Sequence, residues 1–529
     1  MTDVLVIGGG PNGLVAATLL AKAGLRVVLL ERTDRAGGGA RTSEIAPGFR
    51  GPTLAHAAAI DPAIVRQLDL ERHGLQIVRT EAAVCAPARD GRALVLWNDV
   101  TRAAQSVREH SAHDGAQYPA FLRSVANISR VLRAVCASAP PSIDDPTAAD
   151  VMRLVSTGCA FRGLGKADAY RLLRWMPMAV ADLAAEWFES EPLRATVAAG
   201  GVLGSFLGPW SAGSAALLLL LGSGEGHPIA SGWPAKGGTG AVADALAAAA
   251  RQAGVDIRVQ ADVAGVTVAD GRATGVTLAS GDAVEARAVV SSLDPKRTLL
   301  GLVDPLYLDP EVVRRLQNIR AHGTLAKMNL AVSALPRFTA LASLGEAERT
   351  AAMSGRIRLA GEIDDIERAF DAAKYGGFSD RPWIELTLPS IADPTLAPPS
   401  QHVVSAYVQY APYHLRGTTW DAERERLADA ATQAIERDAP GFAASIVGRQ
   451  MITPLDLERT YGLTGGHIFH GELALDQFFI TRPILGWARY ATPIRGLYLC
   501  GSGTHPGTGL DGRSGALAAR TIVSDLRKR

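Results

Sequence analysis

A group of glycines near the N-terminus has the spacing of a phosphate-binding turn. Gly8, Gly10 and Gly13 match the pattern G-x-G-x-x-G, with Pro11 and Asn12 between the second and third glycines. In such a turn the first glycine permits the sharp bend, the second lets the backbone approach a pyrophosphate, and the third lets a helix pack closely on a strand. The free N–H groups at the helix start then hold the phosphate charge. The spacing therefore predicts a dinucleotide-binding loop.

An acidic residue completes this pattern. Glu31 follows Gly13 at close to the spacing of about 20 residues expected for the group that hydrogen-bonds an adenosine ribose. The sequence also indicates the strands and the helix that must position the glycine turn and Glu31. Apolar residues 3–7 predict a buried parallel strand, residues 14–23 a helix, and residues 25–30 a second buried strand. Together these segments predict a βαβ unit of Rossmann type.

A second glycine-rich turn follows this acidic residue. After Arg32 it brings together Gly38, Gly39, Ala40 and Arg41. Glycines beside a basic side chain would suit a second phosphate or the flavin end of a dinucleotide. The run resembles the double-glycine motif of the superfamily of FAD-dependent amine oxidases and phytoene dehydrogenases. The resemblance implies that the cofactor is FAD, held without a covalent bond.

The C-terminal end of the chain carries a matching block. Residues 496–507 are typical of a strand that ends in a glycine-rich turn, and residues 515–526 predict a terminal helix. This block resembles the C-terminal motif of phytoene dehydrogenase-like proteins, in which the strand end meets the phosphoribityl chain of FAD. The resemblance assigns cofactor contacts here to Gly501, Ser502, Gly509 and Leu510.

A central segment resembles the second FAD-domain piece of the same superfamily. Gly237 and Gly238 precede a predicted helix at residues 241–253, and a short strand is predicted at residues 255–259. Taken alone, these are ordinary α/β elements. The resemblance implies that these glycines contact the cofactor and that the backbone of Val263 pairs with adenine.

Runs within residues 382–413 and 456–477 resemble a narrower family, that of pyridine nucleotide-disulfide oxidoreductase domain-containing protein 2 and its bacterial relatives. The resemblance implies an α/β fold in which a Rossmann-type, GR2-like FAD-binding domain carries a discontinuous α+β substrate-binding domain. The FAD-binding domain is expected at residues 1–80, 224–297 and 485–529, and the substrate-binding domain at residues 81–223 and 298–484.

Candidate catalytic groups lie in the last third of the chain. His467 and His470 occupy a glycine-flanked segment that the family likeness places near the flavin, where an imidazole could orient substrate or move a proton. A structural role for either histidine remains equally open. Asp511 and Arg513 stand at the start of the terminal helix, as a helix cap or as a charged pair that orients a polar substrate. The second alternative argues against a purely hydrocarbon substrate such as a carotene.

These features predict an FAD-dependent dehydrogenase or oxidase. The expected step moves a hydride from a C–H bond of a small organic substrate to flavin N5 and leaves a C=C or C=N bond. Oxygen, a quinone or another compound would then accept the electrons. A flavin-dependent isomerase without net redox change, and a flavin-stabilised protein that binds partners, remain alternatives.

Composition excludes several other classes. The 529 residues are 47% hydrophobic and 20% charged, as in ordinary globular proteins, and the net charge of +1 with no basic tract argues against nucleic-acid binding. Four cysteines without a C-x-x-C pair signal neither a metal site nor a redox disulfide, and they are expected to be core residues in a reducing compartment. The first residues lead straight into an apolar strand with no basic leader, so no signal peptide is expected, and the most apolar stretch, near residues 217–221, is far shorter than the roughly 20 residues of a membrane span. A cytoplasmic protein without a transmembrane segment is expected, and its oligomeric state is left open.

Overall fold

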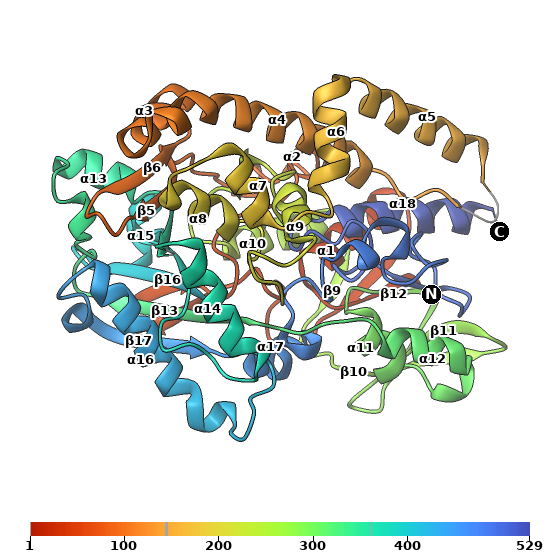
Figure 1. Ribbon diagram of the computed structural model, residues 1–529. Coiled ribbons are helices and arrows are strands. Elements are labelled where there is room, and N and C mark those ends of the chain that lie inside the picture. Colours follow the sequence, from red (N-terminus) through yellow and green to blue (C-terminus); the bar gives the residue numbers. More distant parts are fainter. Residues whose placement is uncertain (1, 143–145, 360, 529) are drawn as a thin grey trace.

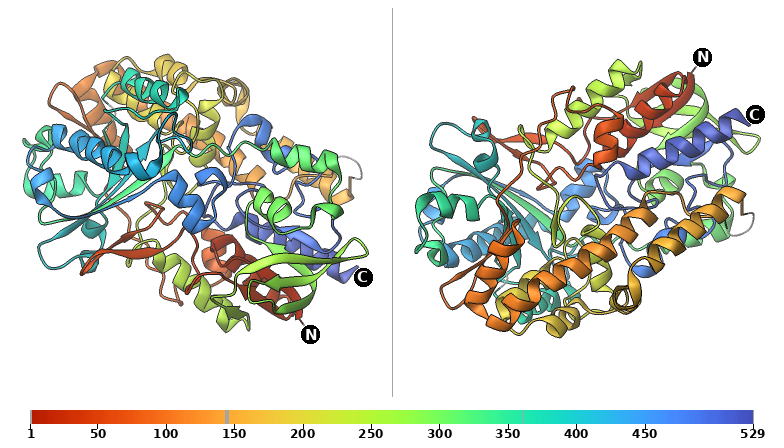
Figure 2. Two further views of the ribbon diagram at one scale, coloured as in Figure 1. Left: turned by 90° about the horizontal axis from the view of Figure 1, so that it is seen from below. Right: turned by 90° about the horizontal axis from the view of Figure 1, so that it is seen from above.

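Two seven-stranded sheets organise the chain, and helices cover both (Figure 1). The computed structural model describes residues 2–142, 146–359 and 361–528. Figure 2 shows both chain ends at the end of the molecule that holds the first sheet.

The first sheet is parallel at its centre and has the order β10-β11-β12-β1-β2-β9, with β18 beside β12. Parallel pairing joins β1 to both β2 and β12. The strand bounds are β1 Thr2–Ile7, β2 Val27–Leu30, β9 Asp256–Arg258, β10 Val263–Ala269, β11 Arg272–Leu278, β12 Ala283–Ser291 and β18 Leu497–Leu499. Helices α1 (Pro11–Lys22), α10 (Gly240–Gln252) and α18 (Arg513–Arg527) share one core with this sheet. The predicted Rossmann-type α/β arrangement is thereby confirmed.

The first helix begins earlier than predicted. Residues 4–6 of β1 are fully buried, as expected of a strand covered on both faces, and Gly8 turns the chain with a φ of 91°. Helix α1 then starts at Pro11 rather than at Leu14. The fixed φ of proline suits the first helical position, where its missing N–H costs no hydrogen bond. The terminal helix likewise starts at Arg513, two residues before the predicted start.

The second sheet is mostly antiparallel and has the order β17-β13-β16-β15-β14-β5-β6. It combines an early hairpin with strands from much later in the chain. Its strands are β5 Ala82–Pro87, β6 Ala93–Trp97, β13 Leu325–Val332, β14 Arg356–Leu359, β15 Ile384–Thr387, β16 His402–Gln409 and β17 Ile446–Ile452. Two small hairpins, β3 (Thr42–Ala46) with β4 (Phe49–Pro52) and β7 (Gly226–His227) with β8 (Ala230–Ser231), complete the strands.

Helices α3 (Val100–His110), α4 (Ala112–Cys136), α5 (Ala148–Arg162) and α6 (Gly165–Trp175) run along the top of the molecule in Figure 1. Helices α7 (Val180–Trp187), α8 (Glu191–Ala199) and α9 (Ser214–Leu221) follow below them. All of these helices except α5 contribute buried residues to the largest core, which they share with the second sheet. The other α-helices are α2 Pro62–Gln67, α11 Pro295–Gly301, α12 Pro310–Gln317, α13 Glu346–Ala352, α14 Ile363–Lys374, α15 Pro389–Ala392, α16 Trp420–Asp438 and α17 Pro454–Tyr461.

The apolar stretch near residue 217 forms the buried helix α9, as predicted. Among the described residues, no helix is both long and apolar enough to cross a bilayer. All four cysteines are free thiols, and three of them are buried. The expectation of core cysteines is wrong for Cys159, because α5 leaves this side chain on the surface.

Each sheet takes its strands from the segments that the sequence assigns to one of the two expected domains. Every strand of the first sheet falls within residues 1–80, 224–297 or 485–529, and every strand of the second falls within residues 81–223 or 298–484. The chain ends assigned to the first domain, residues 1 and 529, lie outside the described residues.

Candidate active site

A cavity of about 310 Å³ lies between the two sheets. On one side it is lined by residues at the carboxyl ends of β1, β2 and β12, among them Gly8, Glu31 and Ser292. On the other side it reaches Arg356 and Tyr407 of the second sheet. In open α/β sheets, ligands bind at this edge of the parallel strands.

Most residues that the sequence assigns to the cofactor line this cavity. They are Gly8, Gly10, Pro11, Asn12, Gly13, Glu31, Arg32, Gly38, Gly39, Arg41, Val263, Ser502, Gly509 and Leu510.

The local geometry fits a dinucleotide. Helix α1 has no side-chain cap at its N-terminus, so its first N–H groups are available to an anion. A Cβ atom built on Gly10 would meet nothing within 4 Å, whereas one on Gly13 would lie 2.2 Å from the Gly8 carbonyl oxygen. Gly10 therefore leaves space beside the cavity, and Gly13 permits the packing of the helix. Glu31 accepts hydrogen bonds from the N–H groups of Gly9 (2.8 Å) and Thr33 (3.0 Å), which fixes its carboxylate at the cavity.

Asn12 joins the two glycine blocks, which lie almost 500 residues apart in the sequence. Its Nδ2 donates to Ser502 Oγ and to the Gly509 carbonyl, both at 3.2 Å. Ser502 Oγ also donates to the Gly509 carbonyl (2.6 Å). A Cβ on Gly515 would lie 2.1 Å from the Asn12 carbonyl oxygen, so helices α1 and α18 start in close contact. The positive ends of two helix dipoles therefore meet at this end of the cavity.

Four residues assigned to the cofactor do not line the cavity. The backbone N–H of Ala40 donates to the Gly37 carbonyl and closes the turn (2.9 Å). Gly237 donates its N–H to Asp393 (2.6 Å), and Gly238 lines a separate, smaller cavity. Gly501 packs so closely on the Ser292 carbonyl that a Cβ would lie 2.3 Å from it. These four residues shape loops next to the cavity, and none of the four is part of its lining.

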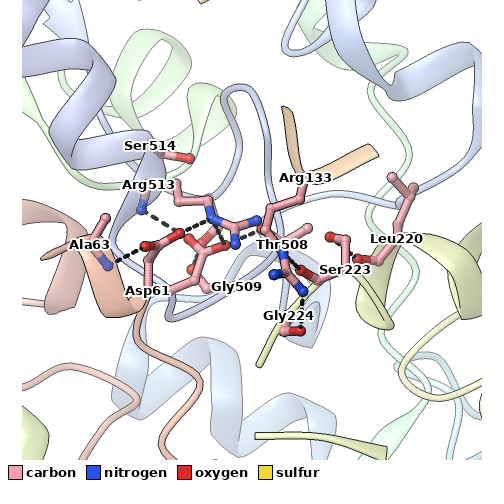
Figure 3. A network of polar contacts seen from close by, with 12 residues as sticks. Asp61, Ala63, Arg133, Leu220, Ser223, Gly224, Thr508, Gly509, Arg513 and Ser514 are labelled. Carbon is pink, nitrogen blue, oxygen red and sulfur yellow. Dashed lines mark hydrogen bonds and ion pairs between the residues drawn. The ribbon is translucent and has the colours of Figure 1, made fainter. Parts of the chain in front are cut away.

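Asp511 and Arg513 both line the cavity, but each is already engaged. Arg513 Nε donates to Asp61 Oδ2 at 2.6 Å, a partner that the sequence did not indicate, and lies 3.8 Å from Asp511 (Figure 3). Asp511 accepts the N–H of Arg513 at the start of α18 (2.9 Å) and the hydroxyl of Thr508. Burial raises the pKa of Asp511. These contacts tie Asp511 to the first residue of α18, whereas the N-cap position itself is Gly512.

A second arginine, Arg133, binds two other residues of the cavity lining. Arg133 of α4 donates to the carbonyls of Ser223 (2.8 Å) and Gly224 (3.1 Å), and both of these residues line the cavity (Figure 3).

The two candidate histidines differ in position. His470 lines the cavity, adopts a φ of 58°, and has no hydrogen-bond partner for Nδ1 among the described residues. Burial lowers its pKa, so the neutral imidazole is favoured. His467 is buried outside the lining of this cavity, and its Nδ1 accepts the N–H of Phe469 (3.2 Å). Burial lowers the pKa of His467 to about 3.

Arg482 holds the His470 segment in place, and its role was not evident from the sequence. This fully buried side chain donates to the carbonyls of Phe469 (2.7 Å), Glu472 (2.9 Å) and Ser502 (2.7 Å). Burial lowers its pKa to about 9. One guanidinium thus ties the segment around His470 to the C-terminal glycine block.

The wall formed by the second sheet was not evident from the sequence either. Lys327, Tyr407, Glu385 and Arg358 stand directly opposite one another on the neighbouring strands β13, β16, β15 and β14. We call these four residues the polar row. Residues directly opposite in a sheet share one face. His56, which follows β4, stacks on Tyr407 with ring centroids 3.6 Å apart, and both line the cavity.

Known proteins match the chain in both sequence and fold. The pattern of the NAD(P)-binding Rossmann-like domain matches residues 6–67, and that of the flavin containing amine oxidoreductases matches residues 188–523. Pyridine nucleotide-disulfide oxidoreductase domain-containing protein 2 of Rattus norvegicus is 36% identical, over 99% of this chain and 94% of that protein. The lycopene-forming phytoene desaturase of Pseudescherichia vulneris is 26% identical, over 100% of this chain and 100% of that enzyme. An oxidoreductase from Methanosarcina mazei has the same fold, with a TM-score of 0.62 and 16% identity over 99% of this chain and 100% of that chain.

The fold, the glycine blocks and these matches define an FAD-dependent oxidoreductase. The chain belongs to the flavin containing amine oxidoreductase family, and it is similar over nearly its whole length to pyridine nucleotide-disulfide oxidoreductase domain-containing protein 2.

Proposed function

We propose that this enzyme oxidises or desaturates a C–C or C–N bond of a small organic substrate. The observation that carries the proposal is the single cavity, which joins the dinucleotide-binding turn to side chains of the second sheet. When bound, FAD supplies the hydride acceptor, its N5 atom. The electron acceptor is left open between oxygen, a quinone and another compound.

The proposal assigns separate roles to residues of the chain: cofactor binding, proton transfer and positioning. Gly10, Gly13 and Glu31 would hold the nucleotide end of FAD, and Leu510 would contact its flavin end. His470 takes up the substrate proton, because it is neutral, lines the cavity and keeps Nδ1 free of partners among the described residues. His467 acts through the backbone of the same segment as a positioning residue.

We assign Asp511 and Arg513 chiefly to holding the start of α18. Arg513 contacts both Asp61 and Asp511, so each charged side chain of this group has a partner within it, with two carboxyl groups to one guanidinium. A buried charge keeps its ionised form at least cost when it is paired in this way. Any direct contact of the two residues with a polar substrate is secondary in this proposal.

The domain boundaries predicted from the sequence belong to the same proposal. We place the FAD-binding domain at residues 1–80, 224–297 and 485–529, with the substrate-binding domain between these pieces. The division of the strands supports this assignment. The free thiols support a reducing compartment such as the cytoplasm.

Anaerobic mixing with candidate substrates tests the proposed reaction. A substrate that is oxidised should bleach the visible absorbance of the bound flavin in a single turnover, and air should restore it. Conversion of a substrate without bleaching would instead support a flavin-dependent isomerase. Stoichiometric capture of a protein partner, with no turnover of amine, alkene or alcohol substrates, would support the binding role.

A further inference from the structure

The polar row and Arg356, which lies two residues before Arg358 on β14, together carry more positive than negative charge. Glu385 is shared by two guanidinium groups, since Arg356 Nη1 donates to one of its oxygens (2.6 Å) and Arg358 Nε to the other (2.9 Å). Lys327 is fully buried, and its ammonium has no hydrogen-bond partner among the described residues. Burial lowers the pKa of Lys327 well below its usual range. Even with Lys327 uncharged, two guanidinium groups share one carboxylate.

Three hydrogen-bond donors of this wall face the cavity. Tyr407 accepts the backbone N–H of His56 at its hydroxyl oxygen (3.1 Å), so its own proton is free to be donated. Neither ring nitrogen of His56 has a hydrogen-bond partner in the described part of the chain, and its Nδ1 is 3.8 Å from Glu385. Burial holds the pKa of His56 well below its usual range, so the ring is neutral and offers one N–H. Arg356 lines the cavity as the third donor: its Nη1 binds Glu385 and its Nη2 binds the Ser231 carbonyl, and a guanidinium has five N–H groups, so further N–H groups remain to be donated.

An anion from the cavity would offset the excess positive charge. Burying an uncompensated charge is costly, and a charge-assisted hydrogen bond to a carboxylate is among the strongest that a guanidinium makes. The neighbouring lining is apolar, with Leu203, Leu218 and Leu221 from the helical region and Ile229 beside the β7–β8 turn. The cavity therefore combines an anion-binding corner with an apolar wall.

Building on the proposed oxidation, we propose that the substrate is an organic carboxylate whose carboxylate binds between Arg356, His56 and Tyr407. Its apolar body lies along the leucine-lined wall. The bond to be oxidised then belongs to that body rather than to a free amine with a net positive charge, which the excess of cations in this corner would repel.

The test is a binding titration of the FAD-loaded enzyme, followed by the visible spectrum of the flavin. Octanoate is the anionic probe and octanamide is its neutral match. Octanoate should give a saturable spectral change and bind more tightly than octanamide. Arg356→Gln should weaken octanoate by about 10–100-fold, and Tyr407→Phe, which keeps the ring, by about 3–10-fold. Arg314→Gln, which alters an exposed arginine paired with Glu311, is the control and should leave the dissociation constants of octanoate and octanamide unchanged.

Three outcomes would overturn the proposal. One is equal affinity for octanoate and octanamide, and another is the absence of any saturable change with octanoate. The third is a shift of the flavin reduction potential in Arg356→Gln with unchanged octanoate affinity, because the positive charge would then serve the flavin itself. The titration needs bound flavin but no turnover, so it stays interpretable if the proposed oxidation fails. If Arg356→Gln does not fold, the octanoate affinity of Tyr407→Phe tests the proposal instead.

Discussion

The two walls of the cavity are built in opposite ways. The nucleotide wall consists largely of backbone from short, continuous turns, with Gly10 and Gly13 next to the start of α1. The opposite wall consists of side chains brought together from separate strands: Tyr407 of β16 and the arginines Arg356 and Arg358 of β14 line the cavity, and Glu385 of β15 binds both arginines. A backbone wall can bind the phosphates common to all dinucleotides, whereas a side-chain wall sets charge and shape for one substrate class. The difference teaches that cofactor and substrate specificity rest on separate structural devices in this protein.

The largest effect is expected from removing the one carboxylate of the polar row. Glu385→Ala leaves the buried Arg358 and the partly buried Arg356 without their anion and should destabilise the protein by about 3–5 kcal/mol. Thermal melting of the FAD-loaded protein measures the loss. Glu311 also bridges two arginines, Arg314 and Arg315, but on the surface, so Glu311→Ala should leave the melting temperature nearly unchanged. Equal losses in the two variants would show that the polar row is not a buried electrostatic unit.

A substitution on the nucleotide wall should act on the cofactor instead of the fold. Gly10 has a φ of −69° and open space around its missing Cβ, so Gly10→Val is tolerated by the backbone but fills the cavity. We expect FAD affinity to fall at least 100-fold, or about 2.8 kcal/mol. Flavin released from the purified protein provides the measurement, and circular dichroism verifies the fold. Gly158→Val, in open space on α5, is the control. A folded Gly10→Val protein with full flavin content would place the cofactor elsewhere.

These contrasts also explain what could be predicted from the sequence. The turn at Gly8–Gly13 and Glu31 is local, so its spacing alone defined a cofactor site and a Rossmann-type sheet. The contact of Asn12 with Ser502 could be inferred only through the family, since nothing local links the two. The polar row depends on strand register: Lys327 and Glu385 meet Tyr407 because three separate strands align, and no periodicity along the chain records that alignment. The bond from Arg513 to Asp61 was missed for the same reason.

A smaller effect is expected from Glu31→Ala. The carboxylate fixes the N–H groups of Gly9 and Thr33 and is placed for the ribose, so its loss should weaken FAD by roughly 1–3 kcal/mol. Glu31→Gln keeps an oxygen for Gly9 and should lose less. Equilibrium titration of the two apoproteins with FAD compares them. An unchanged FAD affinity in Glu31→Ala would contradict a contact between Glu31 and the ribose.

The last effect concerns pH and the buried His467. Its pKa is lowered to about 3 by burial, so the folded state holds the neutral ring while the unfolded chain takes up a proton below about pH 6.5. The stability contributed by the neutral ring is thus fully present above pH 6.5 and declines as pH falls toward 3, by about 1.4 kcal/mol per pH unit. Unfolding free energies between pH 7.5 and 5 should decline less steeply in His467→Gln. An identical slope in both proteins would contradict the burial of a neutral imidazole.

A crystal structure of the FAD-loaded protein tests the central claim most directly. The account predicts the pyrophosphate at the start of α1 beside Gly10 and Gly13. The flavin ring should lie next to Leu510, facing His56 and Tyr407 across the cavity. Electron density for the flavin outside this cavity, or a ring separated from Tyr407 by protein, would contradict an active site shared by the two walls.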